Sequence, residues 1–106
     1  MTINYKSIAK KLKFEGRAFI NGKYVNAIDG DKFETINPAT GEKLCSVAKC
    51  NHKDVNLAVK FSRKAFISGV WSRTSPEYRK GVLLKLAQLL RETGIENSVL
   101  ECVDTG

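Results

Sequence analysis

The dipeptide Asn21-Gly22 stands between two short runs of apolar and aromatic residues, at 18–20 and 23–25. Asparagine and glycine tolerate positive φ angles, and a two-residue turn with positive φ at both positions joins antiparallel strands in the correct twist. The pattern therefore predicts a β-hairpin with a type I′ turn. No other segment of the chain restricts its own backbone conformation as closely.

A second pair of strands is predicted after the turn at 29–31. Residues 33–36 are aromatic or β-branched at three of four positions, which favours a strand. The segment 37–41, Asn-Pro-Ala-Thr-Gly, ends that strand because proline lacks an amide donor and glycine permits a left-handed exit. A further strand is expected over 43–49, so that residues 18–50 form a strand-rich arm.

Helical patterns begin after residue 50. Asn51 is a good N-cap, and Asp54 places a negative charge at the positive end of the helix dipole. Small and apolar residues at helical spacing predict one packed face on this helix: Val55, Ala58, Val59, Ser62, Ala65 and Phe66. We expect Ser68-Gly69 to end it.

A second helix is predicted from Ser75-Pro76, because proline is favoured at the first helical position. A leucine-rich stripe at helical spacing has to be buried on this helix: Arg79, Val82, Leu83, Leu86, Ala87 and Leu90. The helix should stop at Gly94, and a third, shorter helix should hold residues 95–103. Residues 51–106 are thus a helical segment.

The first 17 residues form a basic leader. Ile3, Ile8 and Leu12 recur among lysines, which predicts a short amphipathic helix. A mitochondrial transit peptide is the alternative interpretation of such a start, but the leader has few serines and one arginine at most. We expect a cytoplasmic protein without a membrane anchor, since no apolar run approaches the length of a membrane span.

The composition predicts a folded chain with one modest core at most. Of 106 residues, 42% are hydrophobic and 27% are charged, which is close to the usual soluble mixture. The formal net charge is +7, but the basic residues are distributed over the polar faces of predicted helices. No nucleic-acid-binding motif accompanies them, so we expect no nucleic-acid partner.

The residues that carry chemistry do not form a recognisable catalytic set. Cys45, Cys50 and His52 are only three candidate ligands, whereas structural zinc needs four, and three cysteines in all suggest reduced thiols. Asp29 and Asp31 flank a glycine and are expected in an exposed turn. No glycine-rich phosphate loop follows a strand.

Several segments together resemble the aldehyde dehydrogenase superfamily from Phe19 to Gly106. They include Phe-Ile-Asn-Gly-Lys-Tyr-Val at 19–25, Phe-Glu-Thr-Ile-Asn-Pro-Ala-Thr-Gly-Glu at 33–42, and Leu-Glu-Cys-Val-Asp-Thr-Gly at 100–106. The resemblance implies an α/β fold of which this chain is the N-terminal part, with β-hairpins followed by about three helices and without the Rossmann-type core. It also implies that Trp71 is an anchor between helices, with a buried indole whose N–H finds a partner.

The resemblance implies a fragment of an NAD(P)-dependent oxidoreductase that converts aldehydes to carboxylic acids. Family members use a cysteine nucleophile, a glutamate base and a dinucleotide-binding turn, and none has a counterpart here. We therefore expect the chain alone to be inactive and to bind neither NAD nor NADP. The leader and the segments around Trp71 and Ser75 look most like members that oxidise amino-aldehydes.

Two further expectations follow from the same resemblance. Some family members hold Na+ or K+ through two backbone carbonyls and a carboxylate, at positions that correspond to Thr35, Ile36 and Asp104, with a further ligand from beyond this chain. Alternatively, Asp104 caps or terminates the third helix. The other expectation concerns association. An interaction module that docks onto a full-length dehydrogenase through Leu83, Leu86 and Leu90 is the alternative to an inactive fragment.

Overall fold

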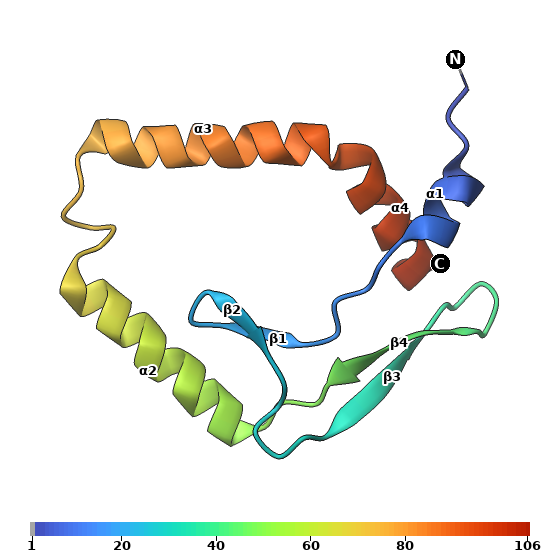
Figure 1. The fold of residues 1–106 in the computed structure, drawn as a ribbon, viewed down its shortest axis with the longest axis horizontal. Coiled ribbons are helices and arrows are strands. Elements are labelled where there is room, and N and C mark those ends of the chain that lie inside the picture. The colour runs from blue at the N-terminus through green and yellow to red at the C-terminus, as the bar shows by residue number, and fades with distance from the viewer. Residues whose placement is uncertain (1) are drawn as a thin grey trace.

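The computed structural model describes residues 2–106, which form four helices and two separate antiparallel hairpins (Figure 1). The order is the predicted one, a short helix, two hairpins and three helices. In chain order the elements are α1 (Tyr5–Lys11), β1 (Ala18–Ile20), β2 (Lys23–Val25), β3 (Lys32–Ile36), β4 (Lys43–Ala48), α2 (His52–Ser68), α3 (Pro76–Glu92) and α4 (Gly94–Thr105).

The first hairpin has the predicted turn. Asn21 and Gly22 have φ angles of 55° and 76°, so both central positions are left-handed, as a type I′ turn requires. Phe19 lies opposite Tyr24 in the ladder, and their ring centroids are 5.1 Å apart. The Arg17 guanidinium lies 5.6 Å from the Tyr24 ring centroid, which adds a cation–π contact.

The second hairpin pairs β3 with β4 and contains a bulge. Thr35 pairs with Cys45 and Ile36 with Lys43, so the register shifts by one residue between these two pairs. Such a bulge interrupts the ladder and bends the strand that carries the extra residue. The turn at 37–41 is closed by the Gly41 amide, which donates to the Asn37 carbonyl at 2.8 Å.

Helix α2 has the predicted ends, but the side that faces the hairpin only partly coincides with the predicted face. Asn51 and Asp54 form a capping box, and Gly69 ends the helix with a φ of 74°. Of the predicted packed face only Ala58 is half-buried, whereas the other five members are exposed. The packed side instead contains Asp54, Leu57, Ala58 and Phe61. The prediction was correct only in part: Ala58, Ser62 and Ala65 line a cavity with the β1–β2 hairpin, whereas Val55, Val59 and Phe66 are more than half exposed. Local spacing does not specify the side from which the hairpin approaches.

Helices α3 and α4 meet at Thr93. Ser75 caps α3, since its hydroxyl oxygen accepts from the Tyr78 amide at 3.2 Å. The helix ends at Glu92, and Gly94 is the first residue of α4, so the predicted stop at Gly94 marks the start of the next helix. Beyond this break α4 turns toward α1 and packs against it (Figure 1).

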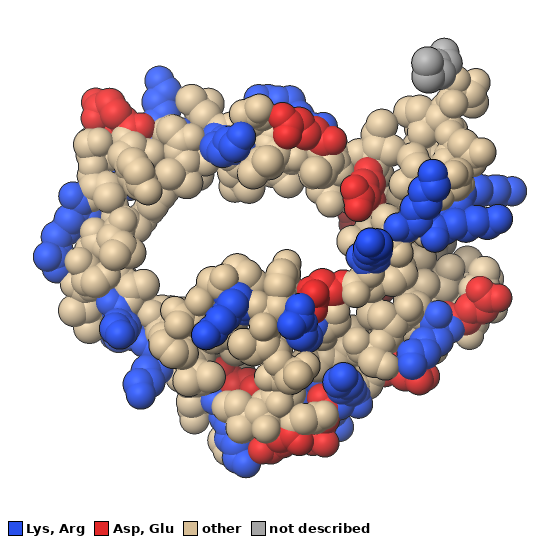
Figure 2. All heavy atoms as spheres, in the orientation of Figure 1, with Lys and Arg blue, Asp and Glu red and all other residues tan. Residues whose placement is uncertain are grey.

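The elements surround an open frame (Figures 1 and 2). Its extents are 47 × 42 × 17 Å and its radius of gyration is 17.7 Å, compared with about 13 Å for a compact domain of about 100 residues. Within residues 2–106 the buried side chains are those of Ala27, Asp54 and Val99. The modest core that the composition allows is therefore not formed by these elements alone.

Candidate functional site

The second hairpin and α4 bring two of the three predicted cation ligands into one cavity. Thr35 and Asp104 both line an open cavity of about 570 Å³, together with residues of the leader and of β4. Ile36 does not line it, and its side chain is 45% exposed. A backbone carbonyl is the group expected from Ile36, so its side-chain direction does not decide its role.

Asp104 lies in the last turn of α4, which ends beside the second hairpin. The last residues of α4 lie against the turn of the second hairpin, where a side chain at Gly106 would be 2.8 Å from Pro38. Asp104 belongs to the last turn of the helix and is exposed. The alternative expectation, that it lies at the helix terminus, thus agrees with its place in the chain and does not exclude a ligand role.

Oxygen-bearing residues are spread along the wall of the cavity and are not gathered around one point. Glu15, Glu101 and Asp104 line it, but both oxygens of Glu15 accept from Arg17, and the Thr35 hydroxyl lies 3.5 Å from both the carbonyl oxygen and the sulfur of Cys45. Lys13 also lines the cavity and supplies an opposing positive charge. Oxygen atoms are the ligands that hard cations prefer, so Asp104 and Thr35 are chemically compatible with the expected monovalent ion.

The cysteine and histidine cluster considered from the sequence is not assembled. In the part of the chain that the structure describes, no three His, Cys, Asp or Glu side chains lie together as metal ligands. Cys45 is half-buried, while Cys50 and Cys102 are exposed, and all three are free thiols. Within residues 2–106 the three cysteines are neither paired with one another nor gathered with His52.

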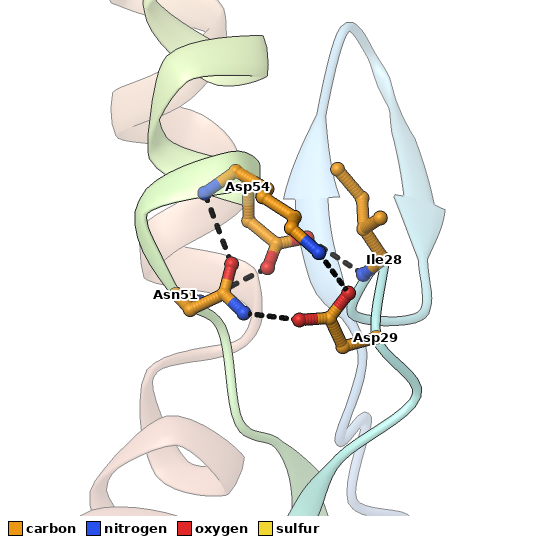
Figure 3. Close-up of polar contacts among 5 residues, drawn as sticks. Ile28, Asp29, Asn51 and Asp54 are labelled. Carbon is orange, nitrogen blue, oxygen red and sulfur yellow. Dashed lines mark hydrogen bonds and ion pairs between the residues drawn. The ribbon is translucent and has the colours of Figure 1, made fainter.

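A polar network joins the start of α2 to the connection between β2 and β3 (Figure 3). The Asp54 carboxylate accepts from the Ile28 amide at 2.9 Å and from the Asn51 amide at 3.0 Å. These backbone donors, that of Asn51 first and that of Ile28 second, hold the pKa of Asp54 below its usual value. Asp29 accepts from the Asn51 side chain at 2.6 Å and from the Lys53 ammonium at 2.8 Å.

Sequence reasoning found only half of this network. It identified the cap formed by Asn51 and Asp54, but it assigned Asp29 to an exposed turn without a partner. The turn itself is present, with Gly30 at a φ of 75°. The bond from Ile28 to Asp54 could have been anticipated, because a capping box uses one carboxylate oxygen of Asp54 and leaves the other free to accept from a distant donor.

The apolar stripe of α3 is uncovered. Leu83, Leu86 and Leu90 are 58%, 51% and 54% exposed. Tyr78, Val82, Leu86 and Leu89 line an open apolar groove of about 510 Å³ on the same helix. Trp71, in the connection between α2 and α3, is 44% exposed, so its expected burial is not achieved within this chain. Such a surface is suited to association rather than to chemistry.

Charge and hydropathy add two observations. On the face shown in Figure 2, lysines and arginines are spread around the frame with acidic side chains among them. No helix within residues 2–106 has the length and apolar character needed to cross a membrane.

Comparisons with known proteins agree on one family. The family model described as "Aldehyde dehydrogenase family" matches residues 24–106. Aldehyde dehydrogenase 1 of Tanacetum cinerariifolium is 50% identical over 103 residues, which cover 97% of this chain and 20% of that protein. Aminoacetaldehyde dehydrogenase of Pseudomonas aeruginosa is 45% identical over 96% of this chain and 21% of its own length.

Solved structures share the open arrangement. The indole-3-acetaldehyde dehydrogenase AldA of P. syringae, in complex with NAD+, has a TM-score of 0.90 and 41% identity, covering 93% of this chain and 20% of that one. The aldehyde dehydrogenase KauB of P. aeruginosa has the same TM-score and coverage at 44% identity. The chain therefore spans about one fifth of the length of the relatives that it matches.

Proposed function

The chain belongs to the aldehyde dehydrogenase family, and on this premise we propose that it acts as the N-terminal arm and first helices of an NAD(P)-dependent enzyme that oxidises aldehydes to acids. The expected family and the expected fold, the N-terminal part of an α/β dehydrogenase, are confirmed. The observation that carries the proposal is the match to 93% of this chain but 20% of a solved dehydrogenase. The frame stays open because it is one part of a larger body.

We propose that the chain alone has no activity. Aldehyde oxidation in the family requires a cysteine nucleophile, a glutamate base and a site for the dinucleotide, and no segment of the 106 residues matches those motifs. The cofactor, NAD or NADP, would be held by other parts of the whole protein, and AldA of P. syringae was solved with NAD+. We place the whole protein in the cytoplasm.

The proposal is tested by assaying the purified chain with NAD+, NADP+ and a simple aldehyde. We expect no formation of reduced nicotinamide, while complete aminoacetaldehyde dehydrogenase of P. aeruginosa serves as the positive control in the same buffer. A rate that scales with the concentration of the purified chain and is lost when the chain is removed by affinity capture would contradict the proposal.

The uncovered α3 stripe supports a second function, docking onto the remainder of a dehydrogenase polypeptide. In relatives about four fifths of the length lies outside the match, enough to cover this face. We propose that co-expression of this chain with a P. aeruginosa relative shortened by its matching fifth restores dehydrogenase activity. Leu86→Glu should abolish the recovery, because it places a charge in the apolar groove.

A matched control lies on the same helix. Gln88 lies on the opposite side of α3 from Leu86, by helical spacing, and its amide donates to Glu92 at 2.8 Å. Gln88→Glu introduces the same charge outside the groove and should preserve the recovered activity. Equal activity from both variants, or no recovery with the unaltered chain, would argue against docking through α3.

We propose that Thr35, Ile36 and Asp104 contribute oxygen ligands to a Na+ or K+ ion in the whole protein. The shared cavity and its carboxylates support this assignment. Thallium(I) is a heavier ion of the same charge, and crystals soaked with it should show an anomalous peak between Thr35 and Asp104. The peak should disappear in Asp104→Asn, and its absence from the unaltered protein would rule the site out.

A further inference from the structure

We propose that Asp54 and Asp29 form a hydrogen-bonded clamp that sets the angle between α2 and the strand-rich arm, and that the clamp forms in this chain without any partner. The clamp consists of Asp29, Asn51, Lys53 and Asp54 together with the Ile28 amide (Figure 3). This inference goes beyond the proposed function and does not depend on it, since it concerns how the chain holds its own shape.

Asp54 connects two segments that are distant in sequence. One carboxylate oxygen accepts from the Asn51 amide and completes the cap of α2, while the other accepts from the Ile28 amide, 26 residues earlier. Both bonds end on one rigid, planar group that is only 2% exposed. The direction of the helix start is therefore linked to the direction of the chain that leaves β2.

Asp29 belongs to the arm and binds residues at the start of α2. Its two oxygens accept from the Asn51 side-chain amide at 2.6 Å and from the Lys53 ammonium at 2.8 Å, so a residue of the arm holds two residues at the start of α2. Asn51 also accepts from the Lys53 amide at 2.9 Å through its own side-chain oxygen. The contacts of Asp54 and Asp29 share Asn51, and together they restrain both displacement and rotation at this junction.

Apolar contact between the arm and α2 is present but limited, because Ala58 and Phe61 of the helix are only half-buried beside Phe19 and Ile20 of the hairpin. Phe19 on the hairpin is 64% exposed, and the only buried residue of α2 is Asp54. Two of the three buried side chains within residues 2–106, Ala27 and Asp54, lie at the clamp itself. Hydrogen bonds are directional, whereas apolar burial is not, so the polar contacts determine the orientation here.

Loss of the Asp54 carboxylate should leave two part-buried backbone donors without partners. Asp54→Ala removes the acceptors of both the Ile28 and Asn51 amides. Asp54→Asn retains one acceptor oxygen but turns an NH2 group toward the second donor, so one bond is lost. In Asp29→Asn one carboxylate oxygen likewise becomes an NH2 group, so the side chain can accept from only one of the two donors, Asn51 and Lys53. The structure thus predicts a graded series, with Asp54→Ala the most severe change.

The test uses the complete 106-residue chain in solution. Amide hydrogen exchange of Ile28 reports the bond to Asp54, and residual dipolar couplings from β1–β2 and from α2 report their relative orientation. In the unaltered chain, Ile28 should be protected and one alignment tensor should fit both elements. In Asp54→Ala, protection of Ile28 should fall at least about tenfold, as loss of a hydrogen bond of roughly 1.4 kcal/mol implies, and the two elements should require separate tensors.

Glu77→Gln is the matched control. It also removes an acid from the first turn of a helix, but on α3, where the clamp has no member. It should leave the protection of Ile28 and the single tensor unchanged. Protected amides in the middle of α2 show, for each variant, that the helix is still folded. If Asp54→Ala does not fold, the same measurements are made on Asp54→Asn and Asp29→Asn.

The proposal is overturned by any of three results. One is an unaltered chain that is unfolded or that needs two tensors, since the clamp then does not act alone. Another is a single tensor that persists in both Asp54→Asn and Asp54→Ala. The last is an equal loss of Ile28 protection in Glu77→Gln, which would reveal a general effect of charge at helix starts.

Discussion

Gly16 illustrates at the scale of one residue how a close backbone approach selects an amino acid. Its carbonyl accepts from the Ala48 amide at 2.7 Å, and a Cβ atom at this position would lie 2.0 Å from the Ser46 carbonyl oxygen. We expect Gly16→Ala to separate the leader from β4 and to destabilise the chain by roughly 1–3 kcal/mol. Urea unfolding followed by circular dichroism measures the difference.

Gly81 is the matched control for this prediction. It lies inside α3, and a Cβ there would meet no atom within 4 Å. Because alanine is the better helix former, Gly81→Ala should stabilise the chain by about 0.5–1 kcal/mol. If both substitutions changed the unfolding free energy in the same direction, the close contact at Gly16 would not be the cause.

The Asp54 carboxylate should also make the chain sensitive to acid. Its pKa is lowered in the folded state by the amides of Asn51 and Ile28, so the charged form is the one that folding favours. Its contribution to stability is therefore complete above the unfolded aspartate value of about 3.9 and is lost as pH falls through the lower folded value.

A pH series of unfolding free energies tests this sign. The difference between the unaltered chain and Asp54→Asn should be largest near neutral pH and should shrink below about pH 4. The asparagine side chain of the variant cannot titrate, so only the unaltered chain loses this contribution. A difference that stayed constant down to strongly acidic pH would show that protonation of Asp54 is not linked to folding.

Individual residues were predictable where the backbone decides their role. The positive φ angles of Asn21 and Gly22 follow from the amino acids themselves, and both are present. Trp71 was expected to be buried but is 44% exposed, because burial depends on a surface that must be supplied from elsewhere. The partners of Asp29 were missed because they lie 22 and 24 residues further along the chain, where local sequence patterns do not reach.

Helix α2 shows at the scale of an element which properties are local. Its cap at Asn51 and its stop at Gly69 were predicted, because hydrogen bonds within a few residues determine them. Its packed face was predicted only in part, because apolar residues lie on more than one side of α2 and the approach of the hairpin selects among them. Periodicity therefore identified the helix but not its orientation.

The two phenylalanines of α2 test this assignment of faces. Phe61 is half-buried and, with Phe19 and Ile20 of the hairpin, lines a shared cavity, whereas Phe66 is 68% exposed. Phe61→Ala should destabilise the chain by about 1–3 kcal/mol, less than for a fully buried phenylalanine. Phe66→Ala should change it by about 0.5 kcal/mol or less.

Thermal unfolding of the two variants measures the contrast. A lower midpoint for Phe61→Ala alone agrees with the observed face. The reverse order would restore the face predicted from periodicity, on which Phe66 and Val59 were expected to pack.

The candidate cation site belongs to the scale of the whole molecule. Thr35 and Asp104 are far apart in sequence, and only the return of α4 to the second hairpin places them around one cavity. Spacing alone gave no reason to connect them, and the connection came from the family resemblance. Periodicity did not predict the open shape either. It indicates that an apolar stripe is covered, but it does not identify the surface that covers it.

The uncovered stripe on α3 should cause the isolated chain to associate. Leu83, Leu86 and Leu90 are each more than half exposed, and removal of such area from water favours contact between copies. The net charge of +7 opposes this contact through repulsion. Because the apolar contact is the stronger effect, sedimentation velocity at increasing protein concentration should show larger species despite this repulsion. Leu86→Glu should shift the distribution back toward the monomer.

Salt separates apolar association from ionic association. Added salt screens the repulsion between copies that each carry +7, so contact through α3 should become stronger as ionic strength rises. Association through opposite charges on different copies would become weaker under the same change. If the larger species dissolve at high salt, or if Gln88→Glu disperses them as well as Leu86→Glu does, the stripe on α3 is not the surface that joins the copies.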